Sequence, residues 1–132
     1  HSWKYAEDEE EAEREKLRQL PPHINVYEIS GPLFFGAADE IGRIVARERA
    51  TCLILRMRSV PSMDSTAMNA MNDLLKRCQK KGITLILSHV NPQPMKVMEK
   101  AGYVDKVGRE NFCENIDAAI AKRGAGKIKT AL

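Results

Sequence analysis

Two short apolar runs, CLILRM at residues 52–57 and ITLIL at residues 83–87, flank a longer stretch with helical periodicity. That stretch begins near Asp64 and ends at Gly82, and its apolar residues recur at spacings of three and four. They form one stripe, whose members are Ala67, Met68, Met71, Leu74, Leu75 and Cys78. A buried strand, a crossing helix and a second buried strand are typical of a parallel sheet with helices on its faces.

The other segments continue this alternation. Residues 24–29 alternate in polarity and predict a strand, and a turn at 30–32 separates it from LFF, which we interpret as a second strand. The later predicted elements are a helix at 36–49, an Asn91-capped helix ending at Gly102, a strand at 104–107 and a helix at 111–123. The predicted fold class is therefore α/β, with a mixed, mostly parallel sheet covered by amphipathic helices.

We divide the chain into three parts, the first of which is marked by its negative charge. Residues 1–20 carry seven acidic and four basic side chains, so this piece has a charge of −3, while the rest carries +6. We expect residues 1–21 to be an acidic helical linker, residues 22–123 to be one folded domain and residues 124–132 to be a flexible tail.

Several classes of protein do not fit this sequence. Its longest uncharged stretch is too short and too polar to span a bilayer, and its acidic start is unlike a signal peptide. No basic run exceeds two residues, and aromatic residues make up only 5%, so nucleic acid is not an expected partner. Because the chain starts at His1 rather than Met, we expect it to be a fragment of a longer protein. Its three cysteines have no CxxC spacing and predict reduced thiols, buried at Cys52 and Cys78, in a cytosolic compartment.

Polar side chains follow two of the predicted strands. Asp64, Ser65 and Thr66 (the triplet) come after the strand at 52–57, and Ser88 and His89 follow the strand at 83–87. Ligands of parallel sheets bind beyond the carboxyl ends of the strands, so we expect the two loops to share one rim that binds a partner or an anion.

We do not predict an enzyme. His89 is the only histidine near the expected rim, and no GxSxG turn surrounds Ser65. The sequence also lacks HExxH, paired cysteines and the glycine loops that hold phosphates. No metal and no cofactor are therefore expected.

The residues alone leave three interpretations of the triplet. A short oxygen-bearing side chain there caps the helix, which is worth about 1 kcal/mol. The positive helix end also favours contact with an anion. Phosphorylation of Ser65 or Thr66 is the third interpretation, although Asp64 would repel the phosphate.

Three other features have alternative interpretations. Phe34 and Phe35 predict a core wedge rather than a ligand platform, and Met68 and Met71 predict core packing rather than a partner surface. The basic residues Lys76, Arg77, Lys80 and Lys81 form a solvated helix face or, beside a membrane, a contact for anionic headgroups.

The stretch SMDSTAMNAMNDLLKRCQKKGITLILSHVNPQPMKVMEKAGY resembles the STAS domain of sulfate transporters and anti-sigma factor antagonists, and the resemblance covers about residues 22–123. NVYEISGPLFFGAADEI is more similar to the carboxy-terminal domain of bacterial SulP transporters. The resemblance implies a regulatory and protein-interaction domain at the cytoplasmic face of the plasma membrane. The implied partners are the transmembrane part of the same chain and a cytosolic regulatory protein, with the full-length transporter a homodimer.

The antagonist branch implies a different function. There the serine that matches Ser65 is phosphorylated by a partner kinase, which would make this chain a free-standing anti-sigma factor antagonist. Ala67 stands where that branch prefers glycine, and this departure favours the transporter branch. The resemblance leaves nucleotide binding open, but no motif in this sequence requires a nucleotide.

Deleting residues 1–20 should barely change the melting temperature, because the amphipathic pattern of the domain is complete from Ile24 onward. Thermal unfolding of the two chains measures this. A drop of more than about 5 °C, or roughly 1 kcal/mol, would show that the acidic segment packs on the domain.

Overall fold

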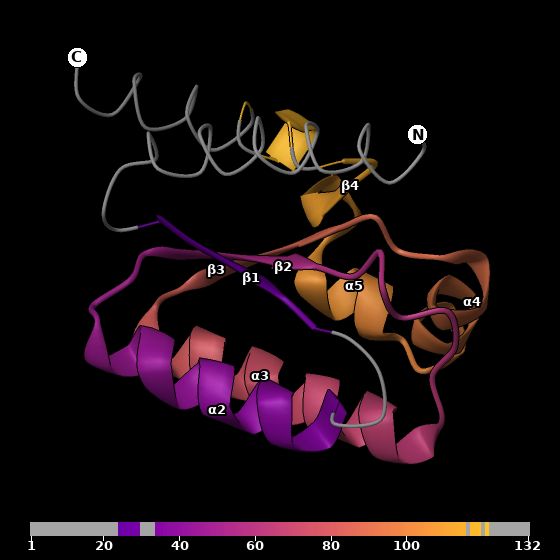
Figure 1. Cartoon of the computed structure of the whole chain (residues 1–132), viewed down its shortest axis with the longest axis horizontal. Helices are drawn as coiled ribbons and strands as arrows, with labels where there is room; N and C mark the ends of the chain where they lie inside the picture. The colour runs from indigo at the N-terminus through magenta and orange to yellow at the C-terminus, as the bar shows by residue number, and fades with distance from the viewer. Residues whose placement is uncertain (1–23, 30–33, 116, 120, 122–132) are drawn as a thin grey trace, which may run out of the picture.

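The computed structural model describes residues 24–29, 34–115, 117–119 and 121 (Figure 1). The elements are β1 (Ile24–Glu28), α2 (Phe34–Arg47), β2 (Cys52–Arg56), α3 (Ser65–Lys81), β3 (Thr84–Ser88), α4 (Pro92–Lys100), α5 (Tyr103–Val107), the 3-10 helix η2 (Arg109–Asn111) and β4 (Phe112–Cys113). Residues 117–119 are also helical. The predicted linker at 1–21 and tail at 124–132 lie outside the described residues.

The sheet has the order β1-β2-β3-β4, and every pairing between these strands is parallel. At the carboxyl edge, Glu28 lies opposite Arg56, Arg56 opposite Ser88, and Ser88 opposite Cys113. α2 and α3 lie side by side along one face of the sheet (Figure 1). The predicted α/β class, with a parallel sheet and covering helices, is confirmed.

The strand predicted at LFF is wrong where the structure describes it. Phe34 and Phe35 are the first residues of α2, while the turn at 30–32 and Leu33 lie outside the described residues. Position 34 is four residues before Ala38, which is the spacing of about one helical turn. The helix therefore begins with two phenylalanines, although aromatic residues by themselves favour strands.

The predicted strand at 104–107 is also wrong, because this segment is the helix α5. Val104 and Val107 are three residues apart and both are buried, which is the spacing of a helix face. Gly102 and Gly108 flank the turn with φ angles of 72° and 102°. The last strand, β4, occupies positions assigned to the predicted helix at 111–123, of which residues 117–119 are helical.

α3 ends at Gly82, as predicted. Gly82 has a φ of 71°, in the left-handed region that favours glycine. Its backbone N–H donates to the carbonyl of Gln79 at 3.2 Å, and the N–H of Ile83 donates to Cys78 at 2.8 Å. This C-cap turns the chain directly into β3.

Each face of the sheet has its own core. On one face, strand residues pack with residues of the covering helices, and these strand residues are Leu53, Leu55, Leu85 and Leu87. Met68 and Met71 belong to this core, so their predicted packing role is confirmed. The core of the opposite face contains Ile24, Cys52, Ile54, Ile86 and Ala119.

Tyr103 connects α5 to the main core. Its side chain is completely buried, and its hydroxyl donates a hydrogen bond to the carbonyl of Met71 in α3 at 2.9 Å. Burial raises the pKa of Tyr103, so the phenol stays neutral. Cys52 and Cys78 are buried and form no disulfide, as expected from their apolar neighbours. Among the described helices, none has the length and apolarity needed to cross a membrane.

The Cys78 thiol should make stability depend on alkaline pH. Burial, together with the neighbouring Cys52, raises its pKa from 9.0 to about 11. The unfolded chain therefore loses this proton at lower pH than the folded chain, so stability is full below about pH 9 and falls as the pH approaches about 11. Urea unfolding at several pH values should show that the free energy of unfolding of Cys78→Ala falls less between about pH 9 and pH 11 than that of the wild type.

Cys113→Ala is the matched control, since it removes a thiol that is only half-buried. If the free energies of unfolding of the wild type and Cys78→Ala fall equally with rising pH, the effect does not come from Cys78.

Candidate functional site

The loop after β2 brings the triplet to the carboxyl edge of the sheet. Asp64 is the N-cap of α3, with an extended backbone (φ −104°, ψ −175°), and its Oδ1 accepts a hydrogen bond from the N–H of Ala67 at 2.8 Å. Ser65 and Thr66 begin the helix with exposed side chains. The capping interpretation is thus confirmed for Asp64, whereas anion contact and phosphorylation stay predictions.

The two loops predicted to share a rim do meet. The side chain of Gln93 accepts from the N–H of Met63 at 2.7 Å and donates to the Met63 carbonyl at 3.2 Å. Asn91 Nδ2 donates to the carbonyls of Val60 and Arg58 at 2.8 and 3.2 Å. Asn91 occupies the predicted N-cap position of α4, but its side chain makes these loop contacts and no cap hydrogen bond.

Ser88 and His89 lie differently from the triplet. Ser88 is completely buried at the end of β3, so its hydroxyl is not on the exposed rim. His89 is partly buried, has a φ of 56° and donates its backbone N–H to the carbonyl of Cys113 at 3.2 Å. A positive φ is uncommon for a residue with a side chain. This bend directs the chain away from β3 towards Asn91 and Gln93, which make the contacts with the other loop.

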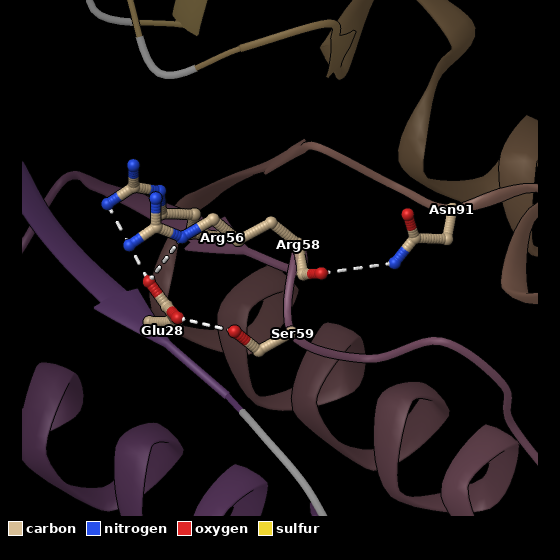
Figure 2. Close-up of polar contacts among 5 residues, drawn as sticks. All are labelled: Glu28, Arg56, Arg58, Ser59 and Asn91. Atoms are coloured by element: carbon tan, nitrogen blue, oxygen red, sulfur yellow. Dashed lines mark hydrogen bonds and ion pairs between the residues drawn. The ribbon is translucent and has the colours of Figure 1, made fainter. Parts of the chain in front are cut away.

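A charged cluster anchors the loop from the side of β1 (Figure 2). Glu28 Oε1 lies 3.6 Å from Arg56 Nη1 and 3.1 Å from Arg58 Nε, and Glu28 Oε2 accepts from Ser59 Oγ at 2.7 Å. The Arg56 side chain is only 6% exposed, so its guanidinium depends on a nearby carboxylate. Glu28 therefore compensates the charge of Arg56 and fixes the first residues of the loop.

The sequence interpretation missed this cluster, although a signal was present. Arg56 is the one charged residue in CLILRM, a run otherwise suited to burial on both faces. A buried arginine requires an opposite charge, and Glu28 holds the matching position on the neighbouring strand. Without the strand register, however, several other carboxylates fitted equally well.

The start of α3 combines a helix N-terminus with exposed hydroxyl groups. The carboxylate of Asp64 is engaged as a cap, and Ser65 and Thr66 present hydroxyls beside the N–H groups of the first turn of α3. Helix starts of this kind stabilise a negative group. Within the described ranges, no three His, Cys, Asp or Glu residues are placed to hold a metal ion.

Comparison with known proteins identifies the family. The family model of the STAS domain matches residues 16–119. The chain belongs to the STAS domain family. The resemblance to the STAS domain is thereby confirmed, and the similarity to the SulP branch is confirmed by the relatives that follow.

Two solved structures are similar over most of their length. The SulP transporter STAS domain of Vibrio cholerae is 31% identical, with a TM-score of 0.76, and the match covers 85% of this chain and 88% of that chain. A sulfate transporter family protein from Wolinella succinogenes is 36% identical, with a TM-score of 0.70. The match covers 78% of this chain and 86% of that chain.

A curated relative is much longer than this chain. The Bacillus subtilis protein named "Putative sulfate transporter YvdB" is 28% identical over 99 residues, which is 73% of this chain but only 19% of that protein. The STAS domain thus spans about a fifth of a relative of this kind.

Asp64→Ala should lower the free energy of unfolding by about 1 kcal/mol, because it removes the cap hydrogen bond to Ala67. Ser65→Ala should change it by less than about 0.5 kcal/mol, since the exposed hydroxyl is not the cap. Chemical unfolding of both variants measures the contrast. A larger loss for Ser65→Ala than for Asp64→Ala would contradict the cap assignment.

Glu28→Gln should destabilise the STAS domain by about 2 kcal/mol, because it removes the carboxylate charge 3.6 Å from the buried guanidinium of Arg56. Glu99→Gln on the exposed face of α4 is the control for loss of one carboxylate and should leave stability unchanged. Equal unfolding midpoints for the two variants would mean that Glu28 is not the anchor.

Proposed function

We propose that this STAS domain is the cytoplasmic regulatory and interaction module of a SulP-type transporter of sulfate or another anion. The observation that carries this proposal is the similarity to two bacterial transporter STAS structures, at 31% and 36% identity over most of each chain. The length of the curated relative further supports a domain within a larger membrane protein. The transmembrane part of the same polypeptide is then its first partner, and the full-length protein forms a homodimer.

The rim triplet is the proposed regulatory surface. Ser65 and Thr66 are exposed, and the loop before them is tied to β1 through Glu28 and to the next loop through Asn91 and Gln93. A negative group added at Ser65 would therefore change the surface charge without moving the loop. A cytosolic protein or the transmembrane part would sense this change.

The transporter function is favoured over a free-standing anti-sigma factor antagonist. Ala67 replaces the glycine of the antagonist motif, and its N–H is already the donor to the Asp64 cap. The similar bacterial structures also come from transporter proteins. On this proposal, the gene encodes membrane-spanning helices upstream of His1, and a gene that starts at this domain would favour the antagonist.

Ser65→Glu in the full-length transporter should lower anion uptake or partner capture by about fivefold or more, because it puts a carboxylate beside Asp64 at the rim. Asn69→Glu, one turn further along α3 and also exposed, is the matched control for an added charge. Uptake assays and pull-down experiments measure the effect, with circular dichroism of the isolated domains as the folding control.

Unchanged uptake and unchanged capture for Ser65→Glu would reduce the triplet to a helix start. An equal loss for Asn69→Glu would mean that the response is to charge anywhere on α3 and not to the rim.

A further inference from the structure

The positive charge of the described residues is concentrated on the second halves of α2 and α3, with the turn after α2. Residues 39–49 and 73–81 contain seven basic and four acidic side chains, a net charge of +3. The other described residues contain six basic and seven acidic side chains, a net charge of −1. One region of this domain is therefore basic, and it lies away from the rim triplet.

An open groove of about 390 Å³ runs along this basic region, lined by Glu40, Arg43, Ile44, Ala46, Arg47 and Arg77. Asp39 accepts from Arg77 Nη2 at 3.0 Å and lies 3.4 Å from Arg43 Nη2, so one carboxylate serves two guanidinium groups. Arg47 has no ion-pair partner among the residues that the structure describes. The groove thus contains more positive charge than its own carboxylates neutralise.

Gly42 helps to build the groove. A Cβ atom at this position would lie 2.9 Å from Cδ of Arg77 and 3.3 Å from Cδ1 of Leu74. Because glycine leaves this space open, the stem of Arg77 crosses close to α2 and its guanidinium reaches Asp39. Helix dipoles favour basic residues in the last turn, which accounts for Arg47, Lys80 and Lys81. Arg43 and Arg77 lie earlier in their helices and are not explained by this effect.

The groove lies at the edge where the sheet begins. Asn25 at the start of β1 donates to Glu48 Oε2, just beyond the end of α2, at 2.6 Å. On the proposed function, the membrane part precedes β1 in the polypeptide, which favours an orientation with this edge towards the bilayer surface. The groove is open rather than enclosed, which suits a layer of headgroups better than a single small ligand.

We propose that the groove formed by Arg43, Arg47 and Arg77 binds the phosphate groups of anionic phospholipids and orients the domain at the membrane surface. This inference rests on the proposed function, which holds the domain close to a bilayer. Each basic residue near an anionic membrane strengthens binding about fivefold, and the three together by on the order of 100-fold at low salt. The attraction is screened as salt rises.

Sedimentation with vesicles tests the proposal on the isolated chain. We expect binding to vesicles of phosphatidylglycerol mixed with phosphatidylcholine and none to phosphatidylcholine alone. Arg43→Gln with Arg47→Gln should weaken binding on the order of 20-fold, whereas Glu40→Gln should strengthen it about fivefold. Lys96→Gln with Lys100→Gln removes the same charge from exposed positions on α4 and should have a much smaller effect.

Other outcomes would overturn the proposal. Equal losses for the α2 and α4 double variants would show attraction by net charge alone. Saturable binding of inorganic phosphate that Arg43→Lys with Arg47→Lys abolishes would show a site for a free anion, because a membrane surface needs only the charge. Vesicle binding by a domain whose gene lacks membrane helices would uphold this site and reject the transporter assignment. Absence of vesicle binding, with Ser65→Glu still lowering anion uptake, would reject the lipid site and leave the transporter assignment standing.

Discussion

The complete burial of β2 is the constraint around which the layers of this domain are arranged. All five of its residues are buried, so both faces must be covered and both edges must be paired. β1 and β3 pair with it in parallel, and parallel neighbours require crossing connections. α2 and α3 are those connections, and they cover one face of the sheet. β2 also ends in Arg56, a charged residue within the buried layer, which makes the carboxylate of Glu28 necessary.

The same arrangement separates two surfaces. α3 begins at the rim triplet and contributes Arg77 to the basic groove, and Arg77 lies 12 residues after Ser65, about 18 Å along the helix. The rim is held by Glu28, Asn91 and Gln93, while the groove is formed where Gly42 lets Arg77 cross α2. The proposed partner surface and the proposed lipid surface are therefore separate.

The sequence predicted the elements whose side-chain pattern is strong. The stripe of α3, its start at Asp64 and its end at Gly82 were all correct, because periodicity and capping are local properties. The α5 segment is predicted as a strand because its two valines are β-branched and five residues are too few to show a helical period. The ion pair between Glu28 and Arg56 depends on the strand register. The hydrogen bond from Asn91 to the Val60 carbonyl depends on the contact between two loops. Such contacts between distant residues are not specified by any local pattern.

We propose that this domain contacts its partner through the anchored rim. A photocrosslinking amino acid at position 65 of the full-length transporter, compared with one at exposed position 96 on α4, tests it most directly. Our account predicts that position 65 forms a crosslink to the transmembrane part or to a cytosolic protein, and that position 96 does not. Crosslinks of equal yield from both positions, or none from position 65, would contradict it.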